Sequence, residues 1–113
     1  MAYDEELAQR FRDQLDGLPG ISEKKMMGGI CFLVDGNMIG GASRNKEGLG
    51  HFLFRVGKEN QEEAQRRFGG EVMEMGGRKM SGFFSVDEDD CDETKLNDWV
   101  TFAHAFASSL PPK

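Results

Sequence analysis

A short apolar run closed by an Asp-Gly pair limits the possible folds of this chain more than any other stretch. Residues 30–34 read Ile-Cys-Phe-Leu-Val, which is too short for a typical helix and rich in β-branched and aromatic side chains. Asp35-Gly36 follows, and this pair suits the two positive-φ positions of a type I′ turn. Residues 37–41 then return along the run. The sequence therefore predicts a β-hairpin over residues 30–41.

Both faces of this hairpin are expected to be largely apolar. Successive residues of a strand point to opposite faces, so the register decides which side chains lie together. Starting from Val34 opposite Asn37, the predicted pairs are Phe32–Ile39 and Ile30–Gly41 on one face, and Leu33–Met38 and Cys31–Gly40 on the other. A single layer of helices would cover one of these faces and leave the other open.

An amphipathic helix is predicted at each end of the chain. Near the N-terminus, Leu7, Phe11 and Leu15 recur every four residues. Near the C-terminus, Asp92 or Thr94 could cap a helix. The apolar stripe of that last helix comprises Leu96, Trp99, Val100, Ala103, Phe106, Ala107 and Leu110.

Three more strands and one more helix are predicted between these two helices. The strands are expected at residues 51–56, 72–75 and 80–86, and a mostly solvated helix at residues 58–68. The polar segment 21–27 is not counted among the strands. The predicted order is therefore α-β-β-β-α-β-β-α. This order indicates a two-layer α+β domain with a mainly antiparallel five-stranded sheet and its helices on one face.

Length and charge narrow the functional classes. The 113 residues suit one domain, over residues 1–113. The net charge of −6 opposes attraction to a polyanion, which argues against direct nucleic-acid binding. No apolar run approaches the roughly 20 residues that span a bilayer, and the polar N-terminus has no signal-peptide core. We therefore expect a cytoplasmic protein with no membrane association.

We find no motif for catalysis, phosphate binding or metal binding. The acidic run at residues 87–93 lacks the glycine and the final glutamate of a calcium loop, and no phosphate-loop string occurs. His51, His104, Cys31 and Cys91 occur singly at large spacings, unlike the close pairs of zinc ligands. Burial in an apolar strand should also make the thiol of Cys31 inert. We expect no enzymatic activity, no cofactor and no metal site.

Two basic pairs, each followed by methionine, suggest a contact surface. Methionine adapts to irregular partners, and seven methionines are many for a chain of this length. A solvated strand edge with methionines packed inward explains the same pattern. The candidate interaction surface comprises Lys24, Lys25, Met26, Met27, Gly28, Gly29, Arg78, Lys79 and Met80. The alternative function is a small-ligand-binding or enzymatic domain that uses a groove between Gly28-Gly29 and Arg78-Lys79.

The sheet face without helices supplies a second candidate surface. An exposed apolar patch usually marks an interface, and a twofold dimer is the commonest way to close one. The candidate dimer face comprises Cys31, Leu33, Met38, Leu53 and Phe83. These observations favour a non-catalytic protein-interaction module that forms a homodimer.

Several of these motifs together resemble one family. The matching features are Glu23-Lys24-Lys25-Met26-Met27-Gly28-Gly29, Phe32, Asp35-Gly36-Asn37, Arg55-Val56, Met80-x-Gly82-Phe83 and Trp99. This pattern resembles the N-terminal domain of the TfoX/Sxy competence-regulator family, from Tyr3 to Leu110. One departure is Met27, which stands where phenylalanine is usual.

The resemblance carries its own expectations. It implies an α+β fold like that of the secretion chaperones, often dimeric, and no catalytic residues. It also implies a role in switching on DNA-uptake genes by protein contact with a transcription activator. Full-length members of the family carry a second, helical domain. Because this chain ends at Lys113, we expect a stand-alone N-terminal domain.

Overall fold

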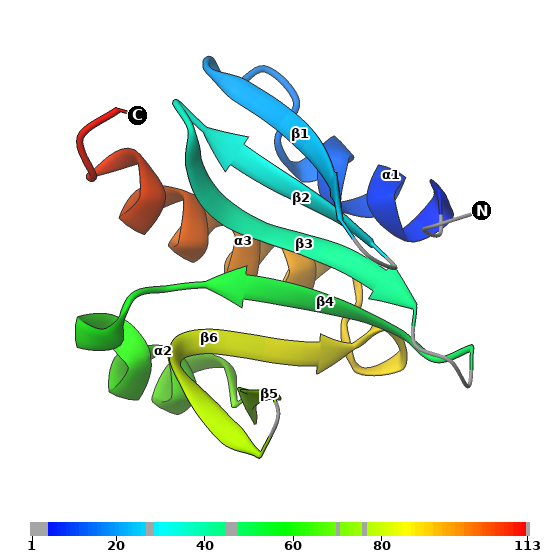
Figure 1. The fold of residues 1–113 in the computed structure, drawn as a ribbon. Helices are drawn as coiled ribbons and strands as arrows, with labels where there is room; N and C mark the ends of the chain where they lie inside the picture. Colours follow the sequence, from blue (N-terminus) through cyan, green and yellow to red (C-terminus); the bar gives the residue numbers. More distant parts are fainter. Residues whose placement is uncertain (1–4, 27–28, 45–47, 70, 76, 113) are drawn as a thin grey trace.

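Six antiparallel strands form one sheet in the order β1-β2-β3-β4-β6-β5 (Figure 1). The structure is a computed structural model, and it describes residues 5–26, 29–44, 48–69, 71–75 and 77–112. The strands are β1 (Ile21–Met26), β2 (Gly29–Val34), β3 (Asn37–Arg44), β4 (Gly50–Arg55), β5 (Glu71–Met75) and β6 (Arg78–Asp87). The helices are α1 (Glu5–Gln14), α2 (Gln61–Phe68) and α3 (Glu93–Ser108), with short 3-10 turns η1 (Lys58–Asn60) and η2 (Glu88–Asp90). The predicted two-layer α+β architecture is confirmed.

The β2–β3 hairpin has the predicted turn but only part of the predicted register. Asp35 and Gly36 both have positive φ, 49° and 84°, as a type I′ turn requires. The pairs Val34–Asn37 and Leu33–Met38 also form as predicted. A bulge then shifts the ladder by one residue, so the predicted pairs Phe32–Ile39, Ile30–Gly41 and Cys31–Gly40 are wrong; the observed pairs are Phe32–Gly40, Cys31–Gly41 and Ile30–Ala42.

Close packing against α1 explains why the bulge lies at this point. Ile39 is fully buried, and its neighbour Gly40 also lies toward the helices. A Cβ at Gly40 would come within 2.1 Å of the Leu53 carbonyl oxygen and 3.1 Å of the Phe11 ring. The bulge therefore lets Ile39 and Gly40 both face the core. Because Gly40 has no side chain, the Phe11 ring fits beside it.

The strand β1 is the element that the sequence prediction missed, which makes the sheet six-stranded instead of five-stranded. Its residues, Ile-Ser-Glu-Lys-Lys-Met, lack the apolar alternation of a half-buried strand. β1 lies at an edge of the sheet, where its described residues pair with β2. Pairing with this apolar strand holds the backbone of β1 in the extended conformation. On the helix side, Glu23 accepts hydrogen bonds from Arg12 of α1 at 2.6 and 2.8 Å. A polar edge strand of this kind also resists edge-to-edge aggregation.

The core lies between the sheet and the helices α1 and α3, as the two apolar stripes predicted. The ring of Phe11 stacks on Phe32 at 4.6 Å and lies 5.8 Å from Phe54. Trp99 of α3 stacks on Phe54 at 5.0 Å and contacts Phe84 at 5.1 Å. These aromatic contacts join both terminal helices to the middle of the sheet.

Candidate functional site: the open face of the sheet

The face of the sheet opposite α1 and α3 can be assigned from the pairing register. Directly paired residues of neighbouring strands share a face. One continuous row crosses all six strands and consists of Lys24, Cys31, Gly41, Leu53, Ser85 and Glu71. The buried residues Phe52, Phe54, Phe84 and Val86 alternate with members of this row, so they point to the helices instead. We call the face that carries this row the open face.

The structure brings all five residues of the candidate dimer face to the open face. Cys31 and Leu53 belong to the row, Leu33 pairs with Met38, and Phe83 lies two residues before Ser85 on β6. Leu33, Met38, Leu53 and Phe83 are half-buried, while Cys31 is only 6% exposed. Figure 1 shows α1 and α3 behind the sheet, with no labelled helix in front of it. An apolar surface across four neighbouring strands thus faces outward in the described structure.

A polar group that the sequence analysis missed lies beside this apolar surface. Gly29, Ser43, His51 and Asp87 form the next row of the open face. The Ser43 Oγ lies 2.9 Å from the His51 Nε2. Only the true register, with its bulge, places these residues together, so sequence motifs alone gave no signal.

The Ser43–His51 pair lacks the further parts of a nucleophilic site. A catalytic histidine needs a second hydrogen-bond partner that orients its ring. Among the described contacts, none joins His51 to its cross-strand neighbour Asp87. The pair therefore forms a polar boundary beside the apolar part of the open face.

Both thiols are shielded by burial. Burial raises the pKa of Cys31, and the nearby Lys24 ammonium lowers it to a smaller extent. Burial raises the pKa of Cys91 from 9.0 to about 11, with a smaller opposing effect from Arg10. Because the thiolate is the reactive form, both groups are poor nucleophiles at neutral pH.

The structure separates the two halves of the candidate interaction surface. Lys24, Lys25 and Met26 lie on β1 and Gly29 opens β2, whereas Arg78, Lys79 and Met80 lie on β6; Met27 and Gly28 lie outside the described residues. Lys24 belongs to the open face, and Lys25 alternates to the helix side. The seven described residues therefore lie in two groups, one on β1 and β2 and the other on β6.

The predicted groove between Gly28-Gly29 and Arg78-Lys79 is not formed by its described members. The strands β3 and β4 lie between β2 and β6. Across the sheet, Gly29 aligns with Asp87 through Ser43 and His51, so Arg78 lies nine residues away at the opposite end of β6. That separation is roughly 30 Å along the strand.

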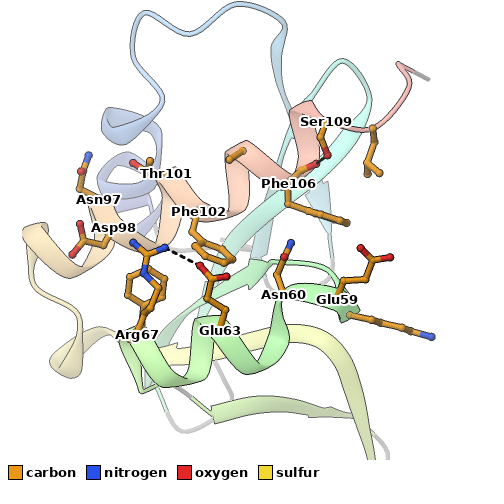
Figure 2. A pocket seen from close by; sticks show the side chains of 14 residues that line it. Glu59, Asn60, Glu63, Arg67, Asn97, Asp98, Thr101, Phe102, Phe106 and Ser109 are labelled. Carbon is orange, nitrogen blue, oxygen red and sulfur yellow. Dashed lines mark hydrogen bonds and ion pairs between the residues drawn. The ribbon is translucent and has the colours of Figure 1, made fainter.

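A hollow lies outside the sheet, between α2 and α3. Its volume is about 850 Å³, and it is lined on one side by residues of η1 and α2 and on the other by α3 (Figure 2). Sequence patterns could not reveal it, because it depends on how far apart the two helices pack.

The described residues contain neither a membrane-spanning helix nor a cluster of metal ligands. None of the helices is long and apolar enough to cross a bilayer. No cluster of three or more histidine, cysteine, aspartate or glutamate side chains is placed to hold a metal ion in the part of the chain that the structure describes.

Comparison with known proteins identifies the family. The model of the TfoX N-terminal domain matches residues 13–107, which include all six strands, α2, all but the last residue of α3 and only the last two residues of α1. The comparisons with curated proteins and with solved structures found no match. The family match covers most of the chain and agrees with the motifs at residues 23–29 and 80–83. The chain therefore belongs to the TfoX N-terminal domain family.

Proposed function

We propose that this domain is a non-catalytic, cytoplasmic protein-interaction module of competence-related regulation, and that its open face docks a second copy of the chain. Membership of the TfoX N-terminal domain family is consistent with a competence-related regulatory module. The observation that carries the proposal is the apolar surface on the uncovered side of the sheet. In this account the homodimer is the unit that contacts a transcription activator.

The composition of the open face supports docking to a protein. Its apolar side chains come from β2, β3, β4 and β6, which are consecutive in the sheet. Four strands span about 14 Å at the usual strand spacing. A patch of this width, continued by the polar row with Ser43 and His51, has the apolar centre and polar rim of a protein interface.

The row from Lys24 to Glu71 has opposite charges at its two ends. These charges support a second copy of the chain as the molecule that docks on the open face. Lys24 ends the row at β1, and Glu71 ends it at β5. A twofold axis parallel to the strands reverses the strand order of the facing sheet. Such an axis directs the Lys24 edge of one protomer toward the Glu71 edge of the other, and the row is therefore complementary to itself.

The regulatory partner has candidate contacts outside this interface. Arg78 and Lys79 are exposed on β6, and Met80 is half-buried beside them. These residues remain the part of the candidate interaction surface best placed for a second protein when the open face is occupied.

A matched pair of leucine variants tests the dimer. Leu53→Lys puts a charge in the centre of the open face, whereas Leu18→Lys puts the same charge at a leucine that is already 37% exposed after α1. We expect Leu53→Lys to raise the dimer dissociation constant at least about tenfold and Leu18→Lys to leave it nearly unchanged. Light scattering over a concentration series measures both. Equal dissociation constants for the two variants would contradict the proposed interface.

A further inference from the structure

The hollow between α2 and α3 is an elongated groove with two helical walls. Figure 2 shows Asn97 and Asp98 at the same end as Arg67, and Ser109 at the same end as Glu59. The two walls therefore run in opposite directions. Grooves between packed helices are a recurrent site for an added amphipathic helix.

Two aromatic rings line the groove, and each packs against neighbouring groups of the domain. Phe102 and Phe106 point from α3 into the groove. The guanidinium of Arg67 lies 5.5 Å from the Phe102 ring, and that of Arg55 lies 5.4 Å from the Phe106 ring. A Cβ at Gly57 would approach the Phe106 ring to 2.4 Å, so the ring packs directly on the backbone there. Both rings are half-buried in these contacts.

The rim of the groove carries more negative than positive charge for a partner to meet. Glu63 is paired with Arg67 at 3.2 Å, so these two charges largely offset each other. Among the described residues, neither Asp98 nor Glu59 takes part in an ion pair. The two carboxylates lie toward opposite ends of the groove, and Lys58 is the remaining cation in its lining.

We infer that this groove binds a basic amphipathic helix of a partner protein. Its apolar face would cover Phe102 and Phe106, and its lysine or arginine side chains would meet Asp98 and Glu59. From Asp98 to Ser109 the α3 wall is about 16 Å long at the usual rise, which matches three turns of a docked helix. This site is separate from the open face and does not depend on dimerisation.

Selection from a displayed library of amphipathic helical peptides tests the inference on the intact domain. Ala105→Trp fills the groove from its α3 wall, and Ser108→Trp places the same ring on an exposed position of α3 outside the lining. We expect the enriched peptides to carry lysine or arginine beside an apolar stripe. Their affinity should fall at least about tenfold for Ala105→Trp and change less than about twofold for Ser108→Trp.

A charge variant and a fold check complete the test. Asp98→Lys lies on the exposed surface of α3, and we expect it to weaken the enriched basic peptides several-fold at low salt, with a smaller effect at high salt. Circular dichroism must show that each variant keeps the wild-type helix content. Enrichment of acidic peptides, equal binding to Ala105→Trp and Ser108→Trp, or no enrichment at all would overturn the inference. Small aromatic molecules that bind the groove when no peptide does would likewise overturn it.

Discussion

Gly82 shows how a single glycine holds neighbouring segments of this domain together. It has φ of 85° within β6, and its carbonyl oxygen accepts hydrogen bonds from the amides of Val56 and Gly57 at 2.8 and 3.2 Å. Its own amide donates to the Gln61 Oε1 at 2.7 Å. One residue therefore ties the end of β4 and the start of α2 to the sheet. An added Cβ there would lie 2.7 Å from the Gly57 carbonyl carbon.

Alanine at two glycines separates backbone strain from lack of space. Gly77 also has positive φ, 81°, but a Cβ there meets nothing within 4 Å. We expect Gly77→Ala to lower the free energy of unfolding by about 1 kcal/mol, and Gly82→Ala to lower it by roughly 3 kcal/mol. Urea unfolding at matched protein concentration measures both. Equal losses for the two variants would show that the close approach at Gly82 is not important.

The buried thiol of Cys91 predicts a loss of stability at alkaline pH. Its folded pKa of about 11 lies above the ordinary value of 9.0, so the folded state favours the protonated thiol. This contribution to the free energy of unfolding is fully present below pH 9 and is lost as pH rises toward 11. We expect Cys91→Ala to show a shallower decline than the wild type over this range. Denaturant unfolding at several pH values measures the difference, and parallel declines would contradict it.

Among the secondary-structure elements, α3 has the clearest start signal. Asp92 is its N-cap, and the Asp92 Oδ1 accepts a hydrogen bond from the Lys95 amide at 2.9 Å. Thr94, the other predicted candidate, lies inside the helix. We expect Asp92→Ala to lower the free energy of unfolding by about 1 kcal/mol and Thr94→Ala to change it by less than half as much. Thermal unfolding followed by circular dichroism distinguishes them, and a larger effect at Thr94 would contradict the cap assignment.

Strongly periodic elements could be predicted from the sequence, and weakly patterned ones could not. The stripes of α1 and α3 and the Asp35-Gly36 turn each combine local propensity with a clear period, so local and tertiary preferences agree. By contrast, β1 is a strand because β2 aligns it, although its own residues are polar. The bulge near Ile39 depends on how Phe11 packs, which no local pattern encodes.

The candidate sites also divide into one that local patterns predict and others that depend on contacts between distant elements. The apolar residues of the open face could be predicted because the bulge changes the face of Gly40 and Gly41 only, while Met38 and the residues of β2, β4 and β6 still alternate as expected. The Ser43–His51 contact required the true register, and the groove between α2 and α3 required the packing of two helices. Neither can be derived from motifs, because both depend on distances between elements far apart in the sequence.

In the whole dimer, we expect opposite charges of the two protomers to face each other. Lys24 of one copy should lie toward Glu71 of the other, across the facing sheets. We expect Lys24→Glu alone to weaken the dimer at low salt and Glu71→Lys alone to do the same. A mixture of the two variants should form a heterodimer in preference to either homodimer. Native mass spectrometry of the mixture reports the species, and a statistical distribution would contradict the proposed axis.

Sedimentation equilibrium of the wild-type domain shows whether a second copy covers the open face in solution. The protomer mass is 12.6 kDa. A micromolar dissociation constant corresponds to a binding free energy of about −8 kcal/mol. At tens of micromolar, well above that constant, we expect a mass near twice the protomer mass and a fall toward the protomer mass on dilution. A mass of 12.6 kDa that does not change over the whole concentration range would contradict the account.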